Sequence, residues 1–476
     1  MNGSFFFDIF CIFCIFAAGI TARLPSSSFT RLMTTMANLI TIKKGLDIPL
    51  QGNAKDETTE DSRTEVFAIT PDDYPGYTWK VAVKPGDTVK CGSPLLCAKE
   101  CGDITLTSPV SGIVSDIHRG ERRKIEFVSV IREGEQTQAE IESDGTLLSG
   151  LRKSGLFALM RQRPYDIVPD CNTAPRDIFV TAFDSAPLAP DLRLNIDDKY
   201  LESGLKALAT LTEGKVYLSV PAGSEIKSNA AEVFEFKGPH PAGNTGTQIA
   251  AIKPVNKGET VWTLDAVTAA RIGEFVETGH ICYDTVVALT GPCMKNPHMI
   301  RTTIGAKLST LLEGEITSDM GKVRTISGNV LTGSRVDITD GFLRYPYRQI
   351  TAIEEGDSAD EFMGWASLSP KKYSVSRAFP AFLRGLSKPF SFDARIKGGH
   401  RAMIMSGEYD KVFPFDIYPE YLLKAIIARN IEKMEERGIY EVAPEDFALP
   451  EFVDTSKLEL QKIVREGLDY LRKETM

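Results

Sequence analysis

The sequence predicts an α+β protein of several domains, in the order barrel-sandwich hybrid, Rossmann-like α/β domain, β-grasp domain and C-terminal helical domain with degenerate ferredoxin-type loops. Three observations lead to this fold class. Short strand-like segments joined by Gly-Asp turns occupy residues 81–131. Strand-like and helix-like segments alternate over residues 150–285, and apolar residues recur at helical spacing after residue 415.

The composition bounds the class of protein. The chain has 476 residues, of which 42% are hydrophobic and 25% charged, as in a soluble protein long enough for three or four domains. The net charge is −9 and no basic patch stands out, so we expect no nucleic-acid partner. The eight cysteines do not have the spacing of a secreted disulfide framework, so we expect free thiols in a reducing compartment.

The first 35 residues are set apart from the fold. Their apolar run, FFFDIFCIFCIFAAGI, has no positive segment before it and is interrupted by Asp8. Three interpretations remain open: a signal peptide, a membrane anchor, or a start codon placed too far upstream, with domain-like sequence beginning at Met36. The third is favoured, and residues 1–35 are treated as an upstream mis-start or a signal-like extension.

Residues 36–140 are expected to form the barrel-sandwich domain. The segments VAVKPGDTVKCGSPLL, SPVSGIV and VSVI predict a small β structure. Their spacing resembles that of biotin- and lipoate-carrying domains, which present one lysine at a hairpin tip. Aligned on Ser111 and Gly112, the tip position here holds Cys101, and Lys99 lies two residues away. Because such an offset moves the side chain along the hairpin, we expect a barrel without biotin or lipoate.

Residues 141–285 are expected to form the α/β domain. DIFVTAF, KVYLSV, EVFEF and TVWTL predict strands, and KYLESGLKALATL predicts a helix. A further helix should begin at Asp265, a good N-cap, and end near Gly279. No G-x-G-x-x-G or G-x-x-x-x-G-K-[ST] phosphate loop occurs in the chain, which argues against a nucleotide on this domain.

The loop between the last two strands is the candidate ligand or partner site. It reads GPHPAGNTG, and its candidate residues are Gly238, His240, Gly243, Asn244 and Gly246. A loop at the edge of an α/β sheet can hold a ligand. The alternative is a structural turn in which glycine and proline set the backbone angles. His240 is the one histidine selected for a functional test, with a packed or solvated histidine as its alternative.

Two further domains complete the chain. Residues 286–356 suggest strand, strand, short helix and strand, a β-grasp (SLBB-like) arrangement. Residues 357–476 are expected to form a helical domain with vestigial iron–sulfur loops, in which residues 415–476 are helical. YPEYLLKAIIARNIEKMEERG predicts a helix that ends at Gly438, and TSKLELQKIVREGLDYLRKE predicts a second helix capped by Asp454 or one of the two residues after it.

The helical domain carries two degenerate ferredoxin-type loops. MIMSGEYDKVFPFD superposes on Cys-x-x-Cys-Gly-x-Cys-x-x-x-Cys-Pro with its glycine on Gly407 and its proline on Pro414. Iron–sulfur clusters need thiolates. The four ligand positions instead hold Met403, Ser406, Tyr409 and Phe413. A weaker copy downstream places these positions on Pro444, Phe447, Pro450 and Asp454.

Large side chains are expected to fill the space of the lost cluster. Met403, Tyr409 and Phe413 should point inward and pack together, with Ser406 at the edge, because empty apolar volume is destabilising and methionine adapts to irregular gaps. The sequence has no histidine pair at i, i+4 spacing and no G-x-S-x-G, and Cys91, Cys97 and Cys101, spaced by six and four residues, do not have a usual zinc or cluster spacing. We therefore expect no catalytic residue and no metal ligand.

Six segments, in order, resemble one protein family over about residues 41–475. They are TIKKGLDIPL, KSGLFALMRQRP, IFVTAFDSAPLAPD, FKGPHPAGNTGT, VRTISGNVLTGS and GEYDKVFPFDIYP. They resemble the A subunit of the Na+-translocating NADH:quinone reductase. The order of domains is more distantly similar to the C subunit of the Rnf complex and to the NADH-binding flavoprotein subunit of complex I, whose Gly-rich flavin loop is missing here. Residues 1–35 have no counterpart in the family.

The resemblance implies a peripheral subunit on the cytoplasmic side of a bacterial inner membrane, in a six-subunit respiratory complex that oxidises NADH, reduces quinone and exports Na+. It implies a subunit that is inactive alone, holds no flavin or iron–sulfur cluster and is associated with the quinone-reducing step. NAD and FAD or FMN would belong to partner subunits, with ubiquinone or menaquinone as the candidate ligand. Two alternatives stay open: a flavin-dependent NADH dehydrogenase subunit, and a purely structural scaffold of a membrane electron-transfer complex.

Overall fold

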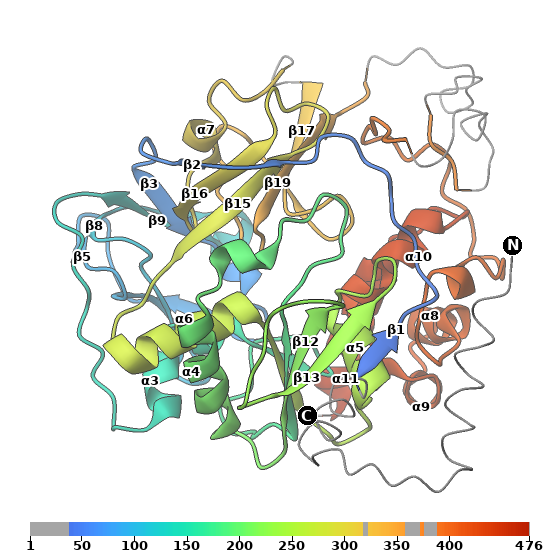
Figure 1. The fold of residues 1–476 in the computed structure, drawn as a ribbon, viewed down its shortest axis with the longest axis horizontal. Coiled ribbons are helices and arrows are strands. Elements are labelled where there is room, and N and C mark those ends of the chain that lie inside the picture. Colours follow the sequence, from blue (N-terminus) through green and yellow to red (C-terminus); the bar gives the residue numbers. More distant parts are fainter. Residues whose placement is uncertain (1–37, 318–321, 358–371, 376–387, 476) are drawn as a thin grey trace, which may run out of the picture. The chain divides into compact units, whose positions relative to one another are not determined.

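The fold is taken from a computed structural model that describes residues 38–317, 322–357, 372–375 and 388–475 (Figure 1). The chain divides into two units, residues 1–39 and residues 40–476, and the domains lie in the second. The expectations for residues 1–35 fall outside the described residues. None of the described helices has the length and apolar character needed to cross a membrane.

Seven short strands form two sheets of the N-terminal part (Figure 1). The larger sheet has the order β3-β9-β8-β5 and the smaller one β4-β6-β7. Their bounds are β3 (Val66–Ile69), β4 (Trp79–Val81), β5 (Thr88–Val89), β6 (Pro94–Ala98), β7 (Thr105–Thr107), β8 (Gly112–Arg119) and β9 (Ile125–Arg132). Buried and exposed side chains alternate along the strands, and the buried ones form the inner face of the sheet. Along β8, for example, Val114 is buried whereas Ile113 and Ser115 are exposed.

The segment before these strands joins the other two sheets. β2 (Lys55–Glu60) pairs in parallel with β16 (His298–Thr303), and the Ile42 N–H donates to the Lys237 carbonyl at 2.7 Å. The expected range 36–140 therefore contains more than the two small sheets. The physical reason is that edge strands of the later sheets offer unpaired backbone groups, which this segment satisfies.

The α/β sheet has the strand order β1-β13-β12-β11-β14-β10. Strands β11 to β14 are parallel, and β10 is antiparallel to β14. The bounds are β1 (Leu39–Thr41), β10 (Arg161–Arg163), β11 (Asp177–Thr181), β12 (Val216–Pro221), β13 (Glu232–Lys237) and β14 (Val261–Asp265). All four strands predicted from the sequence are confirmed.

The helices of this domain are α3 (Leu147–Lys153), α4 (Asp198–Ala209), α5 (Thr245–Ile252) and α6 (Ala266–Thr278). The prediction for α6 is confirmed at both ends. The Asp265 carboxylate accepts the Thr268 N–H at 2.7 Å, and Gly279 ends the helix with φ 74°. Helices α4 and α6 cross at Gly204, where a Cβ would lie 1.8 Å from the Ala269 carbonyl oxygen.

A second six-stranded sheet is mixed, with the order β18-β17-β19-β15-β16-β2. β15 is antiparallel to β16 and parallel to β19. The bounds are β15 (Asp284–Thr290), β16 (His298–Thr303), α7 (Leu308–Leu311), β17 (Val323–Ser327), β18 (Ser334–Val336) and β19 (Gln349–Glu354). The predicted order of strand, strand, short helix and strand is confirmed.

The C-terminal part holds α8 (Pro419–Ile427), α9 (Ile431–Glu436), α10 (Ala448–Val453) and α11 (Leu460–Thr475). The single helix predicted up to Gly438 was wrong, because the chain breaks at Arg429, whose φ is 52°. Asn430 then caps α9 by accepting the Lys433 N–H at 3.0 Å.

The cap predicted for the last helix was also wrong. The Asp454 carboxylate accepts the N–H groups of Ser456 and Leu458, which shapes the turn before α11 rather than its first residue. Short polar side chains bond nearby backbone in this way and so compete with helix formation. Helix α11 begins later, at Leu460.

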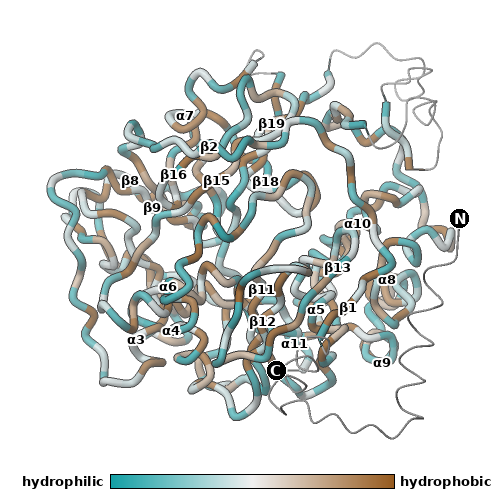
Figure 2. Tube along the Cα trace, viewed as in Figure 1, coloured by the Kyte–Doolittle hydropathy of each residue, from teal (hydrophilic) through white to brown (hydrophobic). Residues whose placement is uncertain are grey.

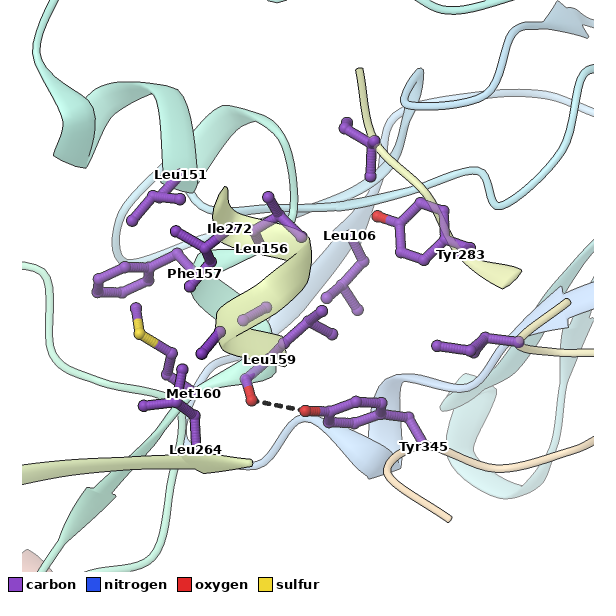
Figure 3. Close-up of a cluster of buried hydrophobic side chains, with 14 of the residues drawn as sticks. Leu106, Leu151, Leu156, Phe157, Leu159, Met160, Leu264, Ile272, Tyr283 and Tyr345 are labelled. Carbon is purple, nitrogen blue, oxygen red and sulfur yellow. Dashed lines mark hydrogen bonds between the residues drawn. The ribbon is translucent and has the colours of Figure 1, made fainter. Parts of the chain in front are cut away.

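One apolar core joins the barrel sheets to the α/β domain. Figure 3 shows Leu106 of β7, Leu151 of α3, Leu264 of β14 and Ile272 of α6 in this cluster. Tyr345 reaches the core and donates through its hydroxyl to the Leu159 carbonyl at 2.6 Å. The central strands β11 and β12 carry hydrophobic residues (Figure 2), and all but the last residue of each is buried. This continuous core fixes the sheet edge described next.

Candidate functional site

A cavity of about 240 Å³ lies at the carboxyl ends of β11 and β14. Thr181, Phe183 and Asp184 line it where β11 ends, and Asp265 lines it where β14 ends. β11 lies between β12 and β14, so the strand order reverses here. In open α/β sheets, ligands bind outside the carboxyl ends of the strands at such a reversal.

Three of the five predicted loop residues line this cavity: His240, Gly243 and Asn244. Gly238 does not, because it packs against the backbone before the barrel: a Cβ would lie 2.2 Å from the Ile42 carbonyl oxygen. Gly246 also lies outside the lining, in the first turn of α5. Other walls come from the loop between β18 and β19, with Tyr345, Tyr347 and Arg348, and from Glu445 of the C-terminal part.

His240 is buried, with 3% of its surface exposed. Its Nδ1 lies 3.0 Å from the hydroxyl oxygen of Ser185, which accepts the Gly243 N–H at 2.8 Å. Which of the two atoms donates in the Ser185 contact depends on the tautomer of the ring. The other ring nitrogen, Nε2, has no hydrogen-bond partner in the described protein. Burial lowers the pKa of His240 to about 4, so the ring is neutral at pH 7.

The buried ring predicts a pH effect on stability. Above a pH of about 6.5, the pKa of histidine in the unfolded chain, His240 is neutral in both states and its lowered pKa does not change the free energy of unfolding. As the pH falls from about 6.5 toward 4, the unfolded chain binds a proton that the folded protein does not, so the free energy of unfolding decreases. Wild type should lose about 3 kcal/mol more than His240→Gln over this range. Denaturant unfolding at pH 7, 5.5 and 4 measures the difference, and parallel curves for the two proteins would contradict it.

Arg163 is the last residue of β10, and only 4% of its surface is exposed. Three carboxylates surround its side chain. Its guanidinium lies 2.8 Å from Glu445, 3.5 Å from Asp446 and 3.8 Å from Asp166. Burial raises the pKa of both Glu445 and Asp446, and the charge of Arg163 opposes that shift. This buried group ties the C-terminal part to the α/β sheet beside the cavity.

The carboxylate of Asp446 lies at the N-terminal end of α5. A Cβ on Gly246 would be 2.3 Å from its Oδ1, so only glycine leaves room for it. Asn244, the N-cap of α5, makes no side-chain cap of its own. A helix N-terminus attracts negative charge, and in nucleotide-binding α/β proteins it receives a phosphate. Here an internal carboxylate occupies that position.

Arg348 is a second buried polar residue among those that line the cavity. Its Nη1 donates to the Asp265 carboxylate at 2.6 Å, and its Nε has no hydrogen-bond partner among the described residues. Nearby, burial raises the pKa of Asp184, which accepts the Ala186 N–H at 2.8 Å. Two residues that line the cavity, His240 and Arg348, thus each have a buried side-chain nitrogen without a hydrogen-bond partner among the described residues.

The four positions aligned with cluster ligands lie away from this cavity. Tyr409 and Phe413 are each 1% exposed in one apolar cluster, Met403 packs against the same cluster, and Ser406 is exposed, as the sequence predicts. Burial and the neighbouring Asp454 carboxylate raise the pKa of Tyr409, so its hydroxyl stays protonated.

The two degenerate loops pack on each other through these positions. Tyr409 of the first loop donates to Asp454 of the second at 2.8 Å. The rings of Phe413 and Phe447 lie 5.0 Å apart. In the described part of the chain, no group of His, Cys, Asp and Glu is arranged to hold a metal ion.

Several cavity residues were missed from the sequence, notably Arg163, Asp184, Arg348 and Glu445. One signal was present: Asp184 follows the predicted strand DIFVTAF directly, at the edge where ligands bind. Arg348 and Glu445 come from other domains, and no local pattern places them here.

Comparison with known proteins gives consistent matches. Family models match residues 40–133 ("NqrA N-terminal barrel-sandwich hybrid domain"), 143–281 ("NqrA second alpha/beta domain") and 286–337 ("NQRA C-terminal domain"). A protein of Rhodopirellula baltica, named as the A subunit of a Na(+)-translocating NADH-quinone reductase, is 35% identical over 93% of this chain and all of its own length. Proteins of the same name from Neisseria meningitidis serogroup B and Actinobacillus succinogenes are 36% and 37% identical, over 92% of this chain and all of their own lengths.

Proposed function

The chain belongs to the family of A subunits of Na(+)-translocating NADH-quinone reductases, and from this we propose that it is a peripheral subunit of that respiratory complex, associated with quinone reduction and free of flavin and iron–sulfur clusters. The name of its relatives supports the overall reaction: NADH is oxidised, quinone is reduced and Na+ is moved. The subunit would act only within the complex.

The partners follow from the same proposal. We place the subunit on the cytoplasmic side of a bacterial inner membrane, bound to membrane-embedded subunits of a six-subunit assembly. NAD and FAD or FMN would bind to partner subunits. We also assign the two larger sheets to the Rossmann-like and β-grasp classes, which the reversal of strand order at β11 and the mixed sheet around β15 support.

Two features support a subunit without redox cofactors. The carboxylate of Asp446 lies at the N-terminus of α5, where it would repel the phosphate of a nucleotide. Buried Tyr409 and Phe413 fill positions that would otherwise hold cluster thiolates. Both features replace a cofactor contact with a contact inside the chain.

The observation that carries the quinone assignment is that two residues lining one cavity, His240 and Arg348, each have a nitrogen atom without a hydrogen-bond partner among the described residues, Nε2 and Nε. Quinone carbonyls accept hydrogen bonds and donate none. The volume of about 240 Å³ suits a ring head group, since it is below the range of roughly 300–1,000 Å³ typical of pockets for larger ligands. Reduction to quinol also takes up protons, and we assign one to Glu445, whose pKa is raised by burial at the cavity wall.

The isolated full-length chain tests the cofactor part of the proposal. We expect a colourless protein with no bound flavin or iron and no NADH-driven dye reduction. Absorbance spectra, elemental analysis and a dye assay measure these properties. Stoichiometric flavin together with NADH oxidation would instead support the flavin-dependent dehydrogenase, and bound iron would contradict the interpretation of the ferredoxin-type loops.

A further inference from the structure

A second cavity, of about 960 Å³, is bordered by the second six-stranded sheet and by the C-terminal part of the chain. Ile326 of β17 and Ile353 of β19 line it from the sheet, and Phe452 of α10 lines it from the C-terminal part. Among the described residues, it shares no lining residue with the cavity at His240. Its volume lies near the upper end of the range of roughly 300–1,000 Å³ that is typical of ligand pockets.

Apolar and aromatic side chains form most of the lining, and we call this surface the apolar wall. The ring of Tyr373 lies 5.4 Å from that of Phe392 and 6.4 Å from that of Phe452. Aliphatic side chains extend the wall: Ile48, Leu50, Ile326, Leu331, Ile353 and Leu458. An apolar lining with a few polar groups is typical of sites for organic ligands.

Two lysines, Lys397 and Lys457, also line the cavity, and both are partly buried. The stem of Lys457 lies against the residue after Lys397, since a Cβ on Gly398 would be 3.3 Å from the Lys457 Cε. The Lys397 Nζ lies 2.8 Å from the Asp393 carboxylate. The Lys457 Nζ forms no hydrogen bond and no ion pair with the described residues. Lys457 is therefore a cation without a partner in the described lining.

The backbone of both lysines is left-handed, with φ of 49° at Lys397 and 57° at Lys457. Glycine adopts this conformation easily, whereas a lysine in it is strained. Strained residues cluster at ligand sites, which indicates that the two lysine side chains are needed where they lie. Burial lowers the pKa of both lysines, and an anion beside them would favour their charged forms.

The carboxylates of the lining are bound to other groups. Asp454 accepts hydrogen bonds from a tyrosine hydroxyl and from two backbone N–H groups, and Glu451 accepts a backbone N–H at 2.9 Å. Glu408 and Glu459 pair with lysines that do not line the cavity. A ligand that contacts Lys457 should therefore supply the negative charge itself.

We propose that this cavity binds an anionic acyl lipid, with its chain on the apolar wall and its carboxylate or phosphate head group on Lys457 and Lys397. A small anion alone would leave the apolar wall exposed to water, and an uncharged chain would leave Lys457 without an anion. A free fatty acid and an anionic phospholipid share the required chemistry, and the test distinguishes these two sources.

Isothermal titration calorimetry on the full-length chain tests the proposal with soluble probes. We expect laurate or dioctanoyl phosphatidylglycerol to bind with one site per chain. Affinity should rise from octanoate to decanoate to laurate, because each added methylene buries apolar surface. Decanol should bind roughly tenfold more weakly than decanoate, which is the factor for loss of one charge-assisted contact. Inorganic phosphate should bind far more weakly than laurate.

Lys457→Gly removes the amine at a position whose left-handed backbone suits glycine, so the fold should be retained, as checked by circular dichroism. Laurate should bind to this variant roughly tenfold more weakly than to the wild type. Lys462→Gln, which changes an exposed lysine of α11, is the matched control and should bind laurate like the wild type. His240→Ala should do the same, because His240 lines the other cavity.

Binding of laurate without the phospholipid identifies a fatty acid as the ligand, and the reverse identifies an anionic phospholipid; either result supports the proposal. The proposal is overturned if neither probe binds, or if Lys457→Gly binds laurate like the wild type. It is also overturned if decanol matches decanoate or inorganic phosphate matches laurate. None of these results depends on whether the chain binds quinone.

Discussion

Phe413→Ala is expected to lower the free energy of unfolding by about 3–5 kcal/mol. The Phe413 side chain is 1% exposed, and its ring lies 4.6 Å from that of Phe415 and 5.0 Å from that of Phe447. Truncation leaves a cavity where the two degenerate loops meet, and the surrounding helices cannot close it fully. Urea unfolding followed by circular dichroism measures the loss.

Ser406→Ala is the matched control, because this neighbouring cluster-ligand position is exposed. Its effect should stay within about 0.5 kcal/mol. If Phe413→Ala proved as mild as this control, the aromatic side chains would not replace a cluster as the support of this loop pair.

Arg163→Met is expected to destabilise the fold by about 3–5 kcal/mol at pH 8, because it leaves the buried carboxylate of Asp446 and the partly exposed carboxylate of Glu445 without their cation. The direction in which stability changes with pH follows from the raised pKa values of Glu445 and Asp446. A carboxyl whose folded pKa is raised is protonated in the fold while the unfolded chain ionises, so the fold loses stability as pH rises through that window. Without the charge of Arg163 the pKa values of both carboxyl groups rise further, so the pH range over which the fold loses stability extends to higher pH.

The destabilisation by Arg163→Met should therefore grow from pH 5 to pH 8, as measured by urea unfolding at each pH. Arg335→Met is the control, since that arginine is exposed and lies 3.9 Å from Glu355. Its effect should be small at every pH. A loss for Arg163→Met that shrinks as pH rises would contradict the assigned charges.

Local signals predicted the elements that local chemistry decides. Helix α6 is capped by Asp265 and ends at Gly279. Both ends could be predicted because a cap and a terminating glycine act only on residues close to them in the sequence. The break between α8 and α9 was not predicted, because the helical spacing of apolar residues continues past Arg429. The break arises from the left-handed backbone of Arg429 and the new N-cap at Asn430. The course of β2 was missed because its partner strand lies far along the chain.

The same limit applies to the candidate site. The loop at His240 was found because its glycines, prolines and histidine lie together between predicted strands. Arg163 and Asp446 are 283 residues apart, and nothing near either residue predicts the other. The space for the Asp446 carboxylate depends on Gly246, which the sequence predicted only as part of a loop for a ligand or partner.

Photo-crosslinking with a quinone analogue in the assembled complex tests the central claim most directly. We expect labelling of this subunit in the peptides that contain His240 and Arg348. Excess quinone should prevent the labelling, and His240→Ala should reduce it with the complex still assembled. Glu432→Gln, on the exposed face of α9, should label like the wild type. Labelling that avoids this subunit, or that persists unchanged in His240→Ala, would contradict the account and support a purely structural scaffold.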